Sequence, residues 1–164
     1  MKGKKESKTV VQEAWIKELV LKNPAKYLLI DDIVSKHKNM EGSLLPILHD
    51  IQFEFGCVED ETKRYLANVL NLTRAEIQGI VSFYHDFANA PSPLPIIKLC
   101  GAEACQARGY RKLRDEIGVV ANGRCQIETV YCLGLCSAGP SAMIGSDVHA
   151  QLNTEKLRHL IEAL

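Results

Sequence analysis

Four of the six cysteines in this chain form two close pairs, and both pairs lie in its second half. The pairs are Cys100 with Cys105 and Cys132 with Cys136. The apolar run Ile96 to Leu99 precedes the first pair, and the alternating segment Cys125 to Tyr131 leads into the second, so each pair follows a predicted strand. Two loops that leave adjacent strands at the same edge of a sheet can bring four thiolates together.

Two kinds of metal centre take four cysteine ligands. A [2Fe-2S] cluster is held by four thiolates. A structural zinc ion is held in the same way, and its range of spacings admits these pairs, so spacing alone leaves both open. A dithiol exchange enzyme needs Cys-x-x-Cys, which the sequence lacks. A Rieske centre needs two histidines close to the cysteines, and none lies inside or between the two pairs, so all-cysteine ligation fits better.

The other two cysteines stand alone. Cys57 follows Phe55 and Gly56 at a predicted helix end, where a buried apolar thiol is the ordinary explanation. Cys125 lies seven residues before Cys132 and could compete as a ligand, but by alternation along the predicted strand it faces away from Cys132. We expect both to be packing cysteines.

Charge and hydropathy limit the classes of partner. Lys plus Arg and Asp plus Glu both total 20, so the zero formal charge gives no general attraction to nucleic acid or anionic lipid. No apolar run approaches the roughly 20 residues needed to cross a bilayer, and the start lacks the apolar core of a secretory signal. We therefore expect a cytosolic protein with no membrane insertion and no nucleic acid partner. In such a protein cysteines serve as metal ligands, redox centres or buried apolar residues rather than as disulfides.

The chain also lacks a nucleotide-binding turn. There is no Gly-x-Gly-x-x-Gly motif and no phosphate loop with Gly-Lys-Ser/Thr. A cluster without a nucleotide or substrate site can only pass on electrons that something else supplies. This implies a partner protein.

Prolines divide the sequence. Three of the six fall within five residues in segment 89–95, which predicts a stiff, non-helical linker. We expect an N-terminal extension at 1–40 that is partly helical, including a helix near 10–21 that ends before Pro24. A small helical bundle at 41–88 follows, and a second domain occupies 96–164.

Helical signals fill the segment before the linker. Leu44 to Phe55 carries apolar residues at spacings of three and four, with Ser43 as the expected N-cap. A second stripe follows Asp60. The third helix opens on Thr73-Arg-Ala-Glu76, which is typical of a capping box. Three short amphipathic helices can bury these stripes only against each other, as a bundle.

Strands alternate with helices after the linker. The first strand is followed by a helix through Leu113 that we expect to stop at Gly118. Segments 141–144 and 148–152 predict a hairpin, and Asn153 is the expected cap of a final helix. The order β-α-β-β-β-α predicts an α+β fold, close to a thioredoxin-like arrangement, with one mixed sheet covered by two helices.

Several longer motifs resemble one family of redox subunits. The motifs are Glu41-Gly-Ser-Leu-Leu-Pro-Ile-Leu-His49, Ala75-Glu-Ile-Gln-Gly-Ile-Val-Ser-Phe-Tyr-His-Asp-Phe87, Cys100-Gly-Ala-Glu-Ala-Cys-Gln-Ala-Arg-Gly109 and Val130-Tyr-Cys-Leu-Gly-Leu-Cys136. In this order they resemble the 24-kDa subunit family of NADH dehydrogenases. The resemblance runs from Glu41 to Leu164, about three quarters of the chain.

The resemblance implies a cofactor and a role. It implies a helical N-terminal part, a thioredoxin-like ferredoxin domain and one [2Fe-2S] cluster on Cys100, Cys105, Cys132 and Cys136, and it favours iron-sulfur over zinc. It further implies a non-catalytic electron-transfer subunit of an NAD-linked oxidoreductase. FMN and NAD would then lie on a flavin-bearing, NADH-binding partner subunit, and a separate catalytic subunit would complete the enzyme.

Three details look most like the gamma subunit of NAD-dependent formate dehydrogenase. They are Glu103-Ala-Cys-Gln-Ala-Arg-Gly109, Val130-Tyr-Cys-Leu-Gly-Leu-Cys136 and Pro140-Ser-Ala-Met143. Bidirectional hydrogenase and NADH-quinone oxidoreductase are the alternatives within the family. The segment between the cysteine pairs looks shorter than in the respiratory pattern, and it carries Cys125. A zinc-stabilised docking module and a redox-sensing thiol protein remain as alternatives of other classes.

Overall fold

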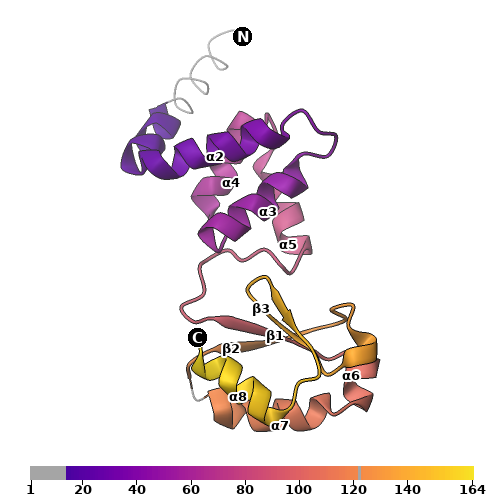
Figure 1. Ribbon diagram of the computed structural model, residues 1–164. Helices are drawn as coiled ribbons and strands as arrows, with labels where there is room; N and C mark the ends of the chain where they lie inside the picture. Colours follow the sequence, from indigo (N-terminus) through magenta and orange to yellow (C-terminus); the bar gives the residue numbers. More distant parts are fainter. Residues whose placement is uncertain (1–13, 122) are drawn as a thin grey trace. The chain divides into compact units, whose positions relative to one another are not determined.

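The chain divides into two compact units, Met1–Pro91 and Ser92–Leu164, each with its own hydrophobic core (Figure 1). The computed structural model describes residues 14–121 and 123–164. The first unit is helical, and the second combines helices with a four-stranded sheet. The predicted fold class, helices followed by a thioredoxin-like α+β domain, is confirmed.

Amphipathic helices build the first unit. They are α2 (Pro24–His37), α3 (Leu44–Phe55), α4 (Asp60–Val69) and α5 (Arg74–Phe83). Helix α2 packs against α3, and α4 packs against α5. Each of these helices has a fully buried side chain in one common core, and the apolar stripes therefore face each other. The four side chains, in helix order, are Ile30, Ile47, Leu66 and Ile77.

Helix α2 is an element that the sequence analysis did not identify. Its start is well marked, because the side chain of Asn23 accepts a hydrogen bond from the Lys26 amide and Pro24 occupies the first turn. Residues 14–22 are also helical, in line with the predicted early helix, whose residues 10–13 lie outside the described part of the chain. Leu19 and Ile30 are buried in the first core, so this core begins well before residue 41.

The capping box at Thr73 is present as predicted. The Thr73 amide donates to the Glu76 carboxylate at 2.7 Å, and the Glu76 amide donates to the Thr73 hydroxyl at 3.2 Å. Ser43 holds the N-cap position of α3 but makes no side-chain capping bond, because its backbone is already in the helical region.

One mixed sheet organises the second unit. Its strands are β1 (Ile96–Cys100), β2 (Gln126–Val130), β3 (Ala142–Ile144) and β4 (Asp147–His149), in the order β2-β1-β3-β4. Strand β1 runs parallel to β2 and antiparallel to β3. Because Cys100 pairs with Val130, the two parallel strands end side by side at one edge of the sheet.

The longer helices of this unit pack against one another. Helix α7 (Tyr110–Ala121) lies beside α8 (Thr154–Glu162), and Figure 1 shows both on the same side of the sheet. Their buried residues share a core with Ile97 and Leu99 of β1. The final helix has the predicted cap, since the Asn153 side chain accepts from the Lys156 amide at 2.8 Å.

The predicted end of α7 at Gly118 is wrong, because the helix continues to Ala121. Ala121 is buried in the second core, and this packing outweighs the cost of about 1 kcal/mol for a glycine inside a helix. The left-handed glycine in this region is instead Gly123.

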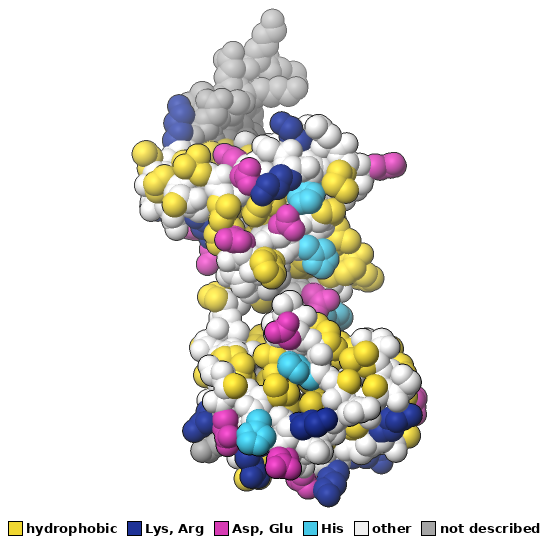
Figure 2. All heavy atoms as spheres, in the orientation of Figure 1, with side chains coloured by type: hydrophobic (Ala, Val, Ile, Leu, Met, Phe, Trp, Pro, Cys, Tyr) yellow, Lys and Arg dark blue, Asp and Glu magenta, His cyan; other side chains and the backbone are white. Residues whose placement is uncertain are grey.

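Large apolar side chains also reach the surface of the helical unit. Figure 2 shows such side chains on the face in view, among charges of both signs. Phe53 and Phe83 are 83% and 72% exposed, respectively. In the described residues no helix is both long and apolar enough to cross a membrane.

Thr73→Ala should lower the free energy of unfolding of the helical unit by about 1 kcal/mol, because it removes the acceptor of the Glu76 amide. The single tryptophan, Trp15, packs against this core, so its fluorescence during urea unfolding reports on this unit. Thr73→Ser keeps the oxygen and should stay close to the wild type. Equal stability of all three proteins would show that the capping box contributes nothing.

Candidate metal centre

The ends of β1 and β2 place all four paired cysteines at one edge of the sheet. Cys100 is the last residue of β1, and Cys105 lies in the short helix α6 (Glu103–Ala107) that follows. Cys132 comes two residues after β2, and Cys136 opens the 3-10 turn η1 (Cys136–Ala138). Since the strands are parallel, both loops leave from the same edge.

The sulfurs are arranged as two pairs. Sγ of Cys132 lies 3.6 Å from Sγ of Cys136. The side chain of Cys105 acts on Cys100 and helps to lower the pKa of that thiol. In residues 14–121 and 123–164, no group of three or more His, Cys, Asp or Glu side chains is placed to hold a single metal ion.

Backbone amides from both loops influence the pKa of the Cys100 thiol. Burial works to raise the pKa of this thiol, but hydrogen bonds outweigh burial and lower the pKa below its usual value. The amides that contribute belong to Ala102, Cys132 and Leu133, and the Cys105 side chain adds to their effect. Groups of both loops therefore act on the same sulfur, which indicates that the two cysteine loops lie close to each other.

The thiol of Cys136 shows the opposite effect. Its hydrogen bond with Cys132 and the charge of that residue raise the pKa of Cys136, and burial and the charges of Cys105 and Cys100 raise it further. The four sulfurs thus lie within one electrostatic field. Metal ligands must be deprotonated, so four thiolates here would repel one another. Bound cations would relieve this repulsion.

The two pairs differ sharply in exposure. Cys100 and Cys105 are each 1% exposed, whereas Cys132 and Cys136 are exposed to solvent. A cofactor held by all four would have one side enclosed by protein and the other side near the surface.

Cys132 has a left-handed backbone, with φ of 77°. This conformation costs about 1–2 kcal/mol for a residue with a Cβ atom. It turns the chain directly after β2, in the loop whose amides lower the pKa of Cys100. Strained residues of this kind cluster at functional sites.

Two glycines allow close packing around the first pair. A Cβ atom on Gly101 would lie 2.8 Å from Cγ2 of Thr129 and 3.1 Å from the ring of Tyr110. A Cβ atom on Gly139 would lie 3.0 Å from Sγ of Cys105. A Cβ atom at Gly101 would force its neighbours to shift, and one at Gly139 would require a smaller adjustment of the Cys105 side chain.

Gly101 lies beside a hydrogen-bond network that the sequence analysis did not identify. The hydroxyls of Tyr110 and Thr129 lie 3.0 Å apart, and Nη1 of Arg114 donates to each at 2.8 Å. The spacing of Tyr110 and Arg114 by one helical turn was the only signal available for it. The network joins α7 to β2 next to Gly101.

The two single cysteines are buried in different units of the chain. Cys57 lies in the helical unit, and Cys125 precedes β2 and belongs to the second core. Burial is the main effect that raises the pKa of each thiol, which makes both poor thiolate donors.

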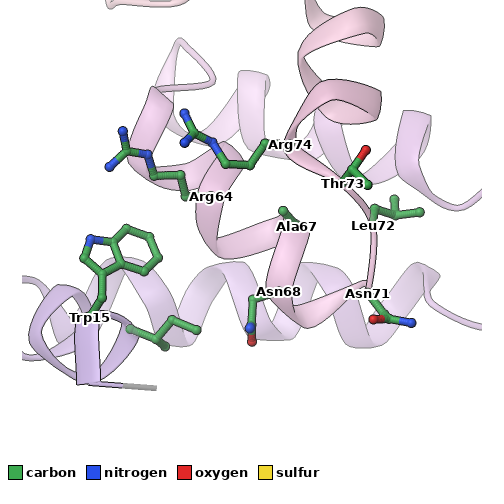
Figure 3. A pocket seen from close by; sticks show the side chains of 9 residues that line it. Trp15, Arg64, Ala67, Asn68, Asn71, Leu72, Thr73 and Arg74 are labelled. Atoms are coloured by element: carbon green, nitrogen blue, oxygen red, sulfur yellow. The ribbon is translucent and has the colours of Figure 1, made fainter. Parts of the chain in front are cut away.

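A separate hollow of about 660 Å³ lies in the helical unit and contains no cysteine. It is lined by Trp15, Arg64, Asn68 and Arg74 among others, and Figure 3 shows the Arg64 side chain above the indole ring. The Arg64 guanidinium lies 5.9 Å from the ring centroid. The hollow therefore has no part in thiolate chemistry.

Comparison with known proteins agrees with this geometry. Residues 30–164 match the thioredoxin-like [2Fe-2S] ferredoxin family. The chain belongs to this family. The predicted recognition is thus confirmed, and the family's cofactor is the [2Fe-2S] cluster that the cysteine pairs and the resemblance predicted.

Relatives of this ferredoxin are subunits of redox complexes. The HndA subunit of the NADP-reducing hydrogenase of Solidesulfovibrio fructosivorans is 30% identical over 74% of this chain and 76% of its own length. A subunit of the NADH-quinone oxidoreductase of Escherichia coli (strain K12) is 25% identical over 81% of this chain and 86% of its own length.

A crystal structure of NAD+-reducing [NiFe]-hydrogenase in the air-oxidized state shares the fold, with a TM-score of 0.62 and 23% identity. The match covers 73% of this chain but 22% of that longer chain.

Gly101→Ala should destabilise the ferredoxin unit by about 1–3 kcal/mol, because the new methyl group overlaps Thr129 and Tyr110. Gly118→Ala in α7 is the matched control, since its Cβ atom meets nothing within 4 Å and should be neutral or stabilising. Urea unfolding of the two variants and the wild type checks this. Equal midpoints for Gly101→Ala and the wild type would contradict the packing argument.

Proposed function

We propose that this ferredoxin holds one [2Fe-2S] cluster on Cys100, Cys105, Cys132 and Cys136 and transfers single electrons as a subunit of an NAD-linked oxidoreductase. The main support is the parallel register of β1 and β2, because it ends the two strands side by side directly before the two cysteine pairs. The loops after both strands also act on the sulfur of Cys100, whose pKa they lower.

The donor set fits a di-iron centre better than zinc. A structural zinc ion needs four ligands around one point. Each iron of a [2Fe-2S] cluster takes two of the four cysteines, so two separate sulfur pairs match its ligation. The sulfurs of Cys132 and Cys136, 3.6 Å apart, form one such pair, and Cys100 with Cys105, whose side chain lowers the Cys100 pKa, would form the other.

When bound, the cluster supplies one-electron redox chemistry at a potential set by its surroundings. The two cysteine pairs of the chain would have different roles. Cys100 and Cys105 hold the enclosed side, where burial excludes water. Cys132 and Cys136 hold the exposed side, which gives a partner protein a short path for electrons.

The partners follow from what this chain lacks. It has no dinucleotide-binding turn, so hydride chemistry at NAD would take place on a neighbouring subunit that carries FMN. The names of relatives point the same way, since one is a subunit of an NADP-reducing hydrogenase and another of an NADH-quinone oxidoreductase. Exposed aromatic residues such as Phe53 and Phe83 would contribute to docking. We place the complex in the cytosol, where reducing conditions keep thiols free for metal.

We further propose NAD-dependent formate dehydrogenase as the parent complex, with this chain in the place of its gamma subunit. The support is the resemblance of the motifs around Cys105 and Cys132. Co-purification from the native host, followed by assays with formate, hydrogen and quinone, tests this proposal. Co-purification with a hydrogenase or a quinone reductase instead would reassign the complex but leave the cluster in place.

Cys132→Ala should abolish the visible absorption of the anaerobically purified protein and most of its iron, because one iron would lose a ligand. Cys57→Ala and Cys125→Ala should keep both, since these buried thiols lie in the cores. The wild type should contain about two irons per chain. Undiminished colour in Cys132→Ala would refute the ligand assignment.

The same samples separate the alternatives of other classes. Colourless protein with one zinc per chain would support a zinc-stabilised docking module. Metal-free protein that forms a reversible disulfide would support a redox-sensing thiol protein.

The isolated chain should be reduced by dithionite but not by NADH, because it has no site for the nucleotide. Addition of the co-purified flavin subunit should allow NADH to bleach the visible spectrum. Bleaching of the isolated chain by NADH alone would contradict the proposal that NADH reacts on a partner subunit.

A further inference from the structure

The hydroxyl group of Ser141 reaches the sulfur of a proposed cluster ligand. Ser141 lies directly before β3, and its side chain is fully buried, at 0% exposure. Its carbonyl oxygen accepts from the Cys100 amide at 2.9 Å, which fixes the residue beside the end of β1. Its Oγ atom lies 3.7 Å from Sγ of Cys105.

The direction of this hydrogen bond follows from the state of the sulfur. In the thiol form either atom can be the donor. A cysteine that binds iron is a thiolate and has no proton to give. The Ser141 hydroxyl must then be the donor and the sulfur of Cys105 the acceptor. Because a buried hydroxyl needs a partner, this bond is favoured over rotation of the hydroxyl toward apolar neighbours.

The surroundings of Cys105 make this contact matter. The residue is 1% exposed, so water does not compete for its sulfur. The backbone of Gly139 lies close to the same sulfur, which limits its movement. On the other side of the site, Cys132 and Cys136 are exposed and can take hydrogen bonds from solvent. The enclosed pair depends on the protein for its donors.

We propose that Ser141 is a positioning residue that donates a hydrogen bond to the Cys105 ligand and thereby raises the reduction potential of the centre. This inference rests on the proposed function. Reduction adds negative charge to the ligand sulfurs, so a donor stabilises the reduced form more than the oxidised form. A residue just before a short strand gives no sequence signal for this role.

Redox titration of the full chain, followed by visible absorption and electron paramagnetic resonance, tests the proposal. Ser141→Ala should lower the equilibrium constant for reduction about tenfold. This corresponds to a reduction potential more negative by about 59 mV for a one-electron couple. Ser82→Ala is the control, because that exposed hydroxyl donates to the carbonyl of Gly79 in the helical unit, and it should cause no shift.

A second pair of variants separates the hydrogen bond from packing. Ser141→Thr and Ser141→Val have nearly the same shape, but only threonine keeps the hydroxyl. A more negative potential in Ser141→Val than in Ser141→Thr supports the proposal, even if Ser141→Ala folds poorly. Equal potentials in this pair, or an unchanged potential in a fully loaded Ser141→Ala protein, would overturn it. Absence of a cluster from the wild type would instead overturn the proposed function.

Discussion

The parallel pairing of β1 and β2 is the interaction on which the candidate centre depends. It brings two loops that are about thirty residues apart in the sequence to the same edge of the sheet. Cys100 pairs with Val130 in this register, and the left-handed backbone of Cys132 turns the chain two residues later. If the strands were antiparallel, the two cysteine pairs would leave the sheet at opposite ends.

The surroundings of the two pairs suit electron transfer between proteins. The inner pair is enclosed by close packing at Gly101 and Gly139 and receives its hydrogen bonds from the protein. The outer pair faces solvent beside Tyr131, which is itself 77% exposed. A centre with this asymmetry has its properties set on one side and exchanges electrons with a partner on the other.

Sequence patterns predicted elements whose signals are local. The capping box at Thr73 and the cap at Asn153 are both present, because each depends on residues three positions apart. Gly118 misled the prediction, since burial of Ala121 decides where α7 ends. Helix α2 was missed although Asn23 and Pro24 mark its start, because exposed Leu28 beside buried Ile30 blurs the apolar stripe. The conformation of Cys132 and the contact of Ser141 arise from tertiary packing, which no spacing rule describes.

Anomalous diffraction at the iron edge, from crystals grown without oxygen, tests the central claim most directly. The account predicts two iron atoms between the loops after β1 and β2, with the sulfurs of Cys100, Cys105, Cys132 and Cys136 as their protein ligands. A single metal ion at this edge, or an iron bound by Cys125 in place of one of these four, would contradict it.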